Sequence, residues 1–395
     1  MEATISAVAA STEPAAAGSA RDDFIDLCRA FSLLMVVIWH WVFTIVIWRK
    51  DGPSANSPLG FTDNLWIITW FLQVMPVFFF VGGHAHLQLW TKLRGGPHGR
   101  FVVGRLRRLL LPSLALLLVW IAIATVVTAT FHVYWFDKAA LLIVSPLWFV
   151  AVYLVLVVLA PITIRLHLRY GPLVVVWMAG LAALADVLRF GQQLAWAAFL
   201  NLVVVWALCH QLGYFYRRLA EGSRTIPWCF VWGGLFGLVG LVLTNIYPPS
   251  MVGVPGDRIS NMGPPTLCIV ALCFFQVGLL LLIRPWVLQR LRRPAWARAN
   301  EVVNRFALPL FLFHTTGYAI AFGLLWLTGY RPPTHPSGAW WAERPIWLVV
   351  PLVCTIPVIL LFGRQWTRRP APRPPPTAAP TPAEPQPFAE AESRW

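Results

Sequence analysis

The stretch FIDLCRAFSLLMVVIWHWVF, residues 24–43, decides the fold class of this protein. It is apolar along nearly its whole length, and the side chains in it that carry charge or titrate near neutral pH are Asp26, Arg29 and His40. A helix needs about 20 mostly apolar residues to cross the hydrocarbon core of a bilayer. The stretch therefore predicts a membrane-spanning helix with polar side chains inside the membrane.

The whole chain has the composition of a membrane protein. Of its 395 residues, 58% are hydrophobic and 12% are charged, and the mean hydropathy is +0.66, whereas soluble domains carry about 25% charged residues. No long polar insert separates the apolar stretches, so we expect an all-α polytopic membrane protein with about ten transmembrane helices. The expected spans are residues 24–48, 64–90, 107–131, 144–164, 172–190, 194–216, 226–247, 264–283, 306–328 and 345–363.

The two ends of the chain differ from the rest in composition. Residues 1–20 contain neither Lys nor Arg and therefore lack the basic start of a signal peptide. Residues 366–395 are rich in Pro, Ala and Glu and show no helical periodicity. Such segments cannot bury a core. We expect a disordered N-terminal arm over 1–20, one membrane domain over 21–365 and a disordered Pro-rich C-terminal tail over 366–395.

Lys and Arg are distributed unevenly over the loops between the spans. The chain has 31 Lys and Arg against 16 Asp and Glu, and most of the basic residues fall in the loops on the side of the two termini. The positive-inside rule then places both termini in the cytoplasm. The same asymmetry explains the net charge of +15 without a nucleic-acid partner. The Ala, Arg, Pro and Trp bias is typical of GC-rich bacteria, so we expect a multi-pass protein of the bacterial inner (cell) membrane.

The polar residues of the first span lie on one side of the helix. At about 100° per residue, His40 projects about 20° from Arg29 and about 40° from Asp26, and Thr44 flanks the same face. An ionisable side chain inside a membrane is by default a candidate for function, although His40 could also be a packing residue that bonds a neighbouring helix. A neutral histidine can remove a proton from a hydroxyl group, so His40 is a candidate general base.

Arginines cluster in GRFVVGRLRRLLLP, residues 99–112, at the start of the third span. Arg105 and Arg108 are spaced i, i+3 and share one helix face. Guanidinium groups bind phosphate through paired hydrogen bonds, so the pair is a candidate phosphate site. The alternative is that the basic loop only anchors the topology.

Other histidines and the cysteines are candidates for metal ligands or cavity residues. His84 and His86 point to opposite sides of a helix and do not chelate one metal; Gly82 and Gly83 beside them favour close helix packing. His314 and Tyr318, spaced i, i+4, form either a cavity wall or a packing face. The six cysteines have no zinc-like spacing, so we expect no metal.

Polar residues also gather near the other end of the fifth span and in the loop before the eighth. Asp186 and Arg189 are spaced i, i+3 and predict a surface ion pair or the lining of an outer vestibule. The loop 256–266, GDRISNMGPPT, is rich in turn-forming and hydrogen-bonding residues, among them Asn261. The loop either sets the start of the next helix or binds a polar acceptor.

Several motifs, in order, resemble the integral-membrane acyltransferase-3 family, which includes O-antigen and exopolysaccharide O-acetylases. FIDLCRAFSLLMVVIWH resembles the opening helix of the family, and MPVFFFVGGHAH resembles its aromatic and glycine-rich second helix. RLRRLLLP carries an Arg-x-x-Arg pattern, PLWFVAVYLVLVVLAP resembles the Trp-Phe helix, and LPLFLFHT resembles a late helix. The resemblance covers residues 21–365.

The resemblance implies an enzyme that moves an acyl group, often acetyl from acetyl-CoA, to a hydroxyl of a glycan, lipid or metabolite of the cell envelope. It implies His40 as the essential histidine and Arg105 with Arg108 as the arginine motif. Together with Arg29, these arginines are expected to hold the phosphates of acyl-CoA on the cytoplasmic side.

The acceptor is expected to reach His40 from the outer side of the membrane, with Asp186, His314 and Asn261 as its candidate contacts. His40 then removes the proton of the acceptor hydroxyl, or forms a transient acyl-histidine. The alternative function is a transporter or flippase of a lipid-linked or polar substrate.

Overall fold

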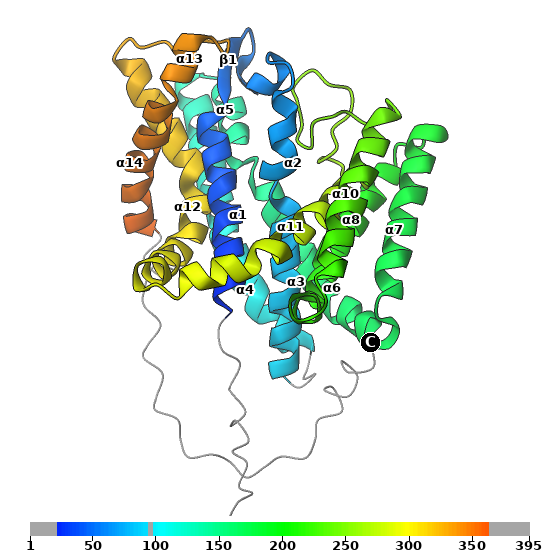
Figure 1. Ribbon diagram of the computed structural model, residues 1–395. Helices are drawn as coiled ribbons and strands as arrows, with labels where there is room; N and C mark the ends of the chain where they lie inside the picture. The colour runs from blue at the N-terminus through cyan, green and yellow to red at the C-terminus, as the bar shows by residue number, and fades with distance from the viewer. Residues whose placement is uncertain (1–21, 94–97, 363–395) are drawn as a thin grey trace, which may run out of the picture.

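The protein is a bundle of long apolar helices. The computed structural model describes residues 22–93 and 98–362, and within these ranges ten helical segments are long and apolar enough to cross a membrane. They stand side by side (Figure 1), which confirms the all-α polytopic fold. The expectations for residues 1–20 and 366–395 lie outside the described residues. The helices are α1 Asp23–Val42, α2 Thr69–Leu72, α3 Met75–Lys92, α4 His98–Phe131, α5 Phe136–Val144, α6 Leu147–Tyr170, α7 Leu173–Asp186, α8 Ala197–Tyr214, α9 Tyr216–Glu221, α10 Thr225–Leu243, α11 Leu267–Leu291, α12 Pro294–Leu327, α13 Gly338–Ala342 and α14 Arg344–Phe362.

The bundle has two ends, which we name the terminal end and the hairpin end. Helix α1 begins at the terminal end, while the strands β1 (Ile45–Arg49) and β2 (Gly52–Asn56) and the short helix α13 lie at the opposite, hairpin end (Figure 1). Helix α14 runs from the hairpin end back toward the terminal end. Both termini of the described membrane domain therefore point to the same side, as an even number of spans requires.

Helix α1 begins at a cap and ends earlier than expected. The carboxylate of Asp22 accepts two backbone N–H bonds, at 3.0 and 3.2 Å, and so satisfies donors at the helix start. The predicted end near residue 48 is wrong, because the helix stops at Val42 and β1 follows, paired antiparallel with β2. Residues of β1 are largely β-branched or aromatic, and such side chains fit a pleated strand better than a helix.

The second span is interrupted between α2 and α3. The side-chain amide of Gln276, on α11, donates to the carbonyl oxygens of Trp70 and Gln73 at 3.0 and 2.9 Å. Backbone carbonyls inside a membrane need a partner because no water reaches them. A buried glutamine on a neighbouring helix thus supplies the hydrogen bonds where the chain leaves helical geometry.

Helices α3 and α8 approach each other through glycines. A Cβ on Gly83 would overlap the carbonyl oxygen of His210, and a Cβ on Gly213 would overlap the carbonyl oxygen of Phe80. Small residues allow membrane helices to pack backbone against backbone. The predicted packing role of the glycine pair in the second span is therefore confirmed for Gly83.

Four helices extend further at the terminal end than the hydropathy pattern predicted: α6 ends at Tyr170 and α11 at Leu291, and two others begin earlier. Helix α4 begins at His98 rather than near 107, and α12 begins at Pro294 rather than near 306. These added turns carry charged residues, which a hydropathy window excludes although they continue the same helix. Arg105 therefore lies inside α4, about two turns after its start at His98.

Candidate functional site

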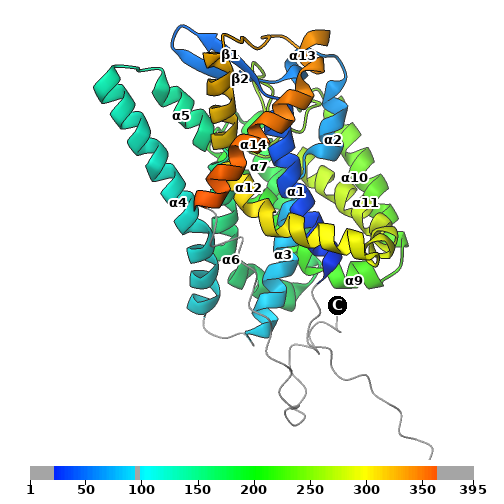
Figure 2. The same cartoon turned by 90° about the vertical axis from the view of Figure 1, so that its left-hand side faces the viewer.

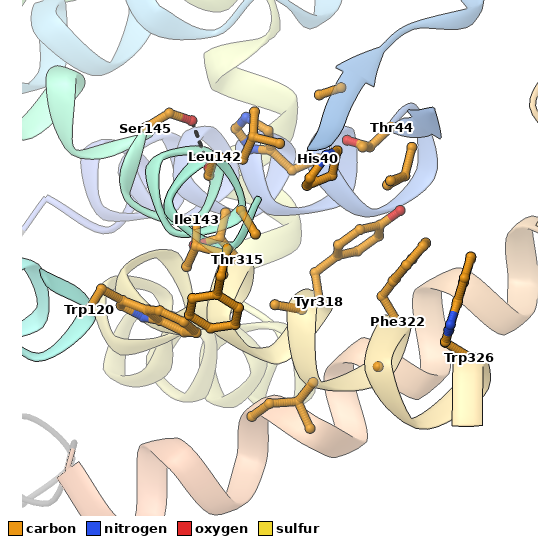
Figure 3. A pocket seen from close by; sticks show the side chains of 18 of the residues that line it. His40, Thr44, Trp120, Leu142, Ile143, Ser145, Thr315, Tyr318, Phe322 and Trp326 are labelled. Atoms are coloured by element: carbon orange, nitrogen blue, oxygen red, sulfur yellow. Dashed lines mark hydrogen bonds between the residues drawn. The ribbon is translucent and has the colours of Figure 1, made fainter. Parts of the chain in front are cut away.

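His40 opens onto a large apolar pocket at the hairpin end of the bundle. The pocket has a volume of about 700 Å³, within the range of about 300–1,000 Å³ that is usual for small-molecule sites. Its walls come from α1, the β1–β2 hairpin, α4, α5 and α12 (Figure 3). We call it the His40 pocket; it is lined by His40, Thr44, Val46, Trp48, Pro53, Ala55, Trp120, Trp135, Phe136, Ala139, Leu142, Ile143, Ser145, Pro146, Thr315, Tyr318, Ala319, Ile320, Phe322, Gly323, Leu324, Trp326 and Leu327.

The structure brings His314 directly against His40. The Nε2 atom of His314 lies 3.1 Å from the Nδ1 atom of His40, and the Nδ1 atom of His314 lies 2.5 Å from the carbonyl oxygen of Phe311. His314 is fully buried, whereas His40 is half-buried at the pocket. The sequence pattern alone left His314 between a cavity wall and a packing residue; the structure makes it the hydrogen-bond partner of the candidate base.

This chain of hydrogen bonds determines which nitrogens carry protons. A carbonyl oxygen only accepts, so we assign the proton of neutral His314 to Nδ1, which leaves its Nε2 as an acceptor. The Nδ1 atom of His40 must then donate to His314. In this tautomer the Nε2 atom of His40 keeps its lone pair, and the carbonyl oxygen of Val36 is a further hydrogen-bond partner of the imidazole ring. This is the tautomer that a general base requires.

The backbone around the pair is fixed by a second contact between α1 and α12. The indole N–H of Trp41 donates to the carbonyl oxygen of His314 at 3.0 Å, and Trp41 is buried. The neighbour of His40 in the chain therefore bonds the backbone of His314, while the two imidazole rings bond each other. The relative position of the rings is set by both contacts.

Two hydroxyl groups share the pocket with His40. Thr44 and Tyr318 both line the pocket, and neither hydroxyl makes a hydrogen bond to a described residue. Figure 3 shows the Tyr318 hydroxyl directed toward the part of the pocket where Thr44 and His40 lie. Neither residue was among the predicted site residues. Their spacing of i+4 from His40 and His314 was the signal that identifies them.

The polar residues at the start of α1 form a separate cluster at the terminal end. Arg29 pairs with Asp26 at 2.8 Å and donates to the side-chain oxygen of Asn304, on α12, at 2.9 Å. Asn304 in turn donates to Asn300. With a rise of 1.5 Å per residue, Arg29 and His40 are about 16 Å apart along α1. The stripe predicted on α1 therefore has two ends with different partners.

Arg105 lies on α4 on the same side of the bundle as Arg29. It is half-buried, and its charge acts on Tyr153 and on His86, while Arg29 also acts on Tyr153. The structure thus brings two of the three arginines predicted for the donor into electrostatic range of one buried tyrosine. The side chain of Arg108 lies outside the described residues.

Asp186 does not form the surface ion pair that its spacing to Arg189 suggested. It is buried, and its carboxylate accepts hydrogen bonds from Asn201 at 2.8 Å, from Tyr247 at 3.0 Å and from the backbone N–H of Leu267 at 2.8 Å. Burial and the Asp186 charge raise the pKa of Tyr247 above its usual value, which keeps its hydroxyl a donor. Asp186 therefore connects α7 with α8, with the loop after α10 and with the start of α11.

Asn261 is likewise occupied within its own loop. Its amide donates to the carbonyl oxygens of Pro248 and Ser250 at 2.6 and 2.9 Å, and its side-chain oxygen accepts from Thr266 at 2.7 Å. The residue is fully buried. Neither Asn261 nor Asp186 lines the His40 pocket, so the structure does not bring these two predicted acceptor contacts together with His40.

A second polar network, which sequence analysis did not anticipate, connects α3, α6 and α8. The Nδ1 atom of His86 lies 2.8 Å from the Nε2 atom of His210, and the other nitrogen of His86 lies 3.2 Å from the hydroxyl of Tyr153. All three side chains are buried. The small residues at the α3–α8 contact were the available signal, because they bring the two histidines within reach. No group of three or more His, Cys, Asp or Glu side chains suited to a metal ion occurs among the described residues.

One known family matches nearly the whole membrane domain. The chain matches the family model Acyl_transf_3, described as an acyltransferase domain, over residues 22–364. Searches among curated proteins and among solved structures found no match. The family model covers nearly the whole membrane domain, including both ends of the α1 stripe and the His40–His314 pair. This multi-pass membrane protein therefore belongs to the acyltransferase-3 family.

Proposed function

We propose that this acyltransferase moves an acyl group, acetyl in the simplest case, from cytoplasmic acyl-CoA to a hydroxyl group that enters the His40 pocket. The observation that carries the proposal is the hydrogen bond between His314 and the Nδ1 atom of His40, a residue that lines the pocket, because this bond assigns the lone pair of His40 to Nε2. A base must be close to the proton it removes and must be unprotonated there. The hydrogen-bond chain through His314 provides this protonation state.

The reaction can be written with this chain's own residues. The Nε2 atom of His40 accepts the proton of the acceptor hydroxyl as the oxygen attacks the thioester carbonyl carbon. The C–O bond forms, the C–S bond breaks, and the CoA thiolate takes the proton back from His40. The positive charge on His40 is shared through its Nδ1–H with His314 while the proton is held. General base catalysis of this kind contributes about 10²- to 10⁴-fold in rate.

Tyr318 is our candidate for stabilising the transition state. As the oxygen attacks, negative charge develops on the carbonyl oxygen of the thioester, and a hydroxyl that is already in place lowers the free energy of that state. Tyr318 lines the same pocket as His40 and has no described hydrogen-bond partner. Thr44 lines the same pocket, and its hydroxyl is our candidate for orienting the acceptor hydroxyl toward His40.

The donor is proposed to bind at the terminal end. Arg29, Arg105 and Arg108 carry guanidinium groups suited to the phosphates of CoA, and Arg29 is held in place by Asp26 and Asn304. The long pantetheine arm would extend from there along α1 toward His40. With the termini in the cytoplasm, as the distribution of Lys and Arg favours, the donor comes from the cytoplasm and the acceptor from the opposite half of the membrane.

The test is acyl transfer from labelled acetyl-CoA by the purified protein in liposomes that contain a cell-envelope extract as acceptor. His40→Ala is expected to lower the transfer rate by about 10²- to 10⁴-fold while leaving binding of acetyl-CoA intact. Arg105→Ala is expected to weaken acetyl-CoA binding instead. Transfer by His40→Ala at the wild-type rate would remove His40 as the base, and a trapped acyl group on His40 would replace the direct route by a covalent one.

A further inference from the structure

The His40 pocket has an apolar rim on the side that faces the lipid. On α12, the lining residues Ile320, Leu324 and Leu327 expose 40%, 53% and 83% of their surface. They belong to a helix that is long and apolar enough to cross the membrane. Apolar side chains that are exposed on such a helix face hydrocarbon. The pocket wall therefore continues directly into the lipid-facing surface of the protein.

Helices α4 and α12 are in contact at one level and separate beyond it. Leu116 of α4 packs with Leu312 and Phe313 of α12, and the indole N–H of Trp120 donates to the hydroxyl of Thr316 at 3.1 Å. Toward the hairpin end, residues 121–131 of α4 are exposed or half-buried apart from Ala124. Figure 2 shows the upper part of α4 diverging from the rest of the bundle there, while α5 leads back and contacts the β1–β2 hairpin and α12. The pocket is lined by residues of α5, α12 and the hairpin at this level.

The pocket offers polar partners at His40 and few elsewhere. Its lining contains no Asp, Glu, Lys or Arg side chain. The hydroxyl of Ser145 already donates to the carbonyl oxygen of Leu142 at 2.8 Å, and the indole of Trp120 is bonded to Thr316. A ligand with many hydroxyls would leave several of them without partners, which is costly for each group. A ligand with one reacting hydroxyl and a hydrocarbon body leaves none.

We propose that the acceptor is a membrane-resident alcohol whose hydrocarbon part enters the His40 pocket sideways from the bilayer, between α4–α5 and α12. This inference rests on the proposed function, because it identifies the class of acceptor that His40 deprotonates. The reacting hydroxyl lies against His40, Thr44 and Tyr318, and the hydrocarbon lies along the aromatic walls and the rim formed by α12. Any polar headgroup is carried outside the apolar part of the pocket.

A glycine pair gives a matched way to block this opening. Gly323 lines the pocket on α12, and a Cβ at Gly323 meets no atom within 4 Å. Gly180, on α7, is also exposed with no atom within 4 Å of a Cβ, and it does not line the pocket. A side chain at Gly323 therefore starts at the pocket wall without a clash at its Cβ, and Gly180→Trp places the same large side chain elsewhere on an exposed helix face.

The experiment uses the full chain in phosphatidylcholine vesicles that contain a long-chain alcohol with a photoreactive diazirine. After illumination, labelled peptides are mapped by mass spectrometry. We expect labelling of α12 and α5 residues around the pocket in the wild type and in Gly180→Trp. In Gly323→Trp we expect at least about tenfold less, the change that corresponds to about 1.4 kcal/mol of binding free energy. A water-soluble short-chain analogue with the same diazirine should not label the pocket.

Each contrary outcome overturns the proposal in its own way. Equal labelling of Gly323→Trp and Gly180→Trp would exclude the lateral opening, and labelling by the short-chain analogue would favour a soluble acceptor. The labelling is repeated with an excess of unlabelled hexadecanol or of palmitoyl-CoA as competitor. If palmitoyl-CoA lowers the labelling more than hexadecanol does, the pocket is assigned to the acyl chain of the donor. Failure of the proposed function is measured separately, in the acyl-transfer assay. If the function fails while the lateral opening is correct, the wild-type pocket is labelled but the wild-type protein transfers no acyl group.

Discussion

Two pairs of histidines join neighbouring helices of this protein, and they differ in what lies beyond each pair. His40 and His314 are linked by a hydrogen bond of 3.1 Å, and His40 faces the pocket of about 700 Å³. His86 and His210 are linked at 2.8 Å, and the remaining nitrogen of His86 lies 3.2 Å from the hydroxyl of Tyr153. The first pair stands at a cavity, which His40 lines, whereas the second pair uses both nitrogens of His86 inside the protein.

Burial of a histidine in a membrane protein therefore does not by itself indicate function. Within the membrane a polar side chain needs partners, and the network around His86 supplies them among α3, α6 and α8. Catalysis needs the opposite arrangement at one atom: a nitrogen that is oriented by a neighbour but not consumed by it. His40 has this arrangement in the assigned tautomer, because His314 holds its Nδ1 atom and His40 lines the pocket.

The largest effect that sharpens the comparison, after the loss of His40 itself, is expected at Tyr318. Tyr318→Phe removes the hydroxyl and keeps the ring that packs against Trp347 in a tilted arrangement. If the hydroxyl binds the developing oxyanion, kcat should fall by about 10²- to 10³-fold, with an unchanged melting temperature. Steady-state kinetics with labelled acetyl-CoA measures this. A rise in KM for the donor at constant kcat would instead make Tyr318 a binding residue.

The next largest effect is expected at His314, which acts through His40. His314→Ala removes the acceptor that fixes the tautomer of His40, and a misplaced base loses about 10²-fold in rate. His314→Gln can offer a carbonyl oxygen to the Nδ1–H of His40 and should recover part of kcat. Both variants should bind acetyl-CoA as the wild type does. Equal activity of the two variants would show that the hydrogen bond to His40 does not matter.

The matched change in the second pair should affect stability instead of rate. His86→Leu leaves His210 and the hydroxyl of Tyr153 without their partner, and a buried polar group without a hydrogen bond costs about 1–3 kcal/mol. Thermal unfolding in detergent should show a lower melting temperature, while the folded fraction transfers acyl groups at close to the wild-type kcat. A large loss of kcat at an unchanged melting temperature would break the comparison and place His86 in the reaction.

The smallest effect is expected at Asp186. Asp186→Asn puts a donor amide where the carboxylate accepts bonds from Asn201, Tyr247 and Leu267, and the loss should be about 1 kcal/mol in stability. The KM for the acceptor should stay constant. If KM rises while thermal stability is unchanged, Asp186 contacts the acceptor as the sequence pattern first suggested.

Much of the fold was predictable because membrane helices are encoded locally. Long apolar runs identified ten spans, and the glycines of α3 indicated close packing. The errors fell at helix boundaries. The end of α1 was predicted too late, because the apolar residues of β1, which begins at Ile45, look like helix residues to a hydropathy window. The charged first turns of α4 and α12 were missed because their hydropathy is low, although the helices continue there beyond the apolar stretch.

The candidate site was predictable only in part. His40 stood out because an ionisable side chain in an apolar helix is rare, and its stripe led to Arg29. The role of Asp186 was not readable, because its partners Tyr247 and Leu267 come from segments far away in the sequence. The network of His86 with His210 and Tyr153 was missed for the same reason.

The sequence by itself determined that this chain spans a membrane many times, that it carries a histidine in its first helix, and that arginines gather near the opposite end of that helix. These properties depend on residues close together in the chain. The packing of distant segments brings His314 against His40 and places Tyr318 and Thr44 in the same pocket. Such contacts depend on how separate helices pack, and no local pattern contains that information.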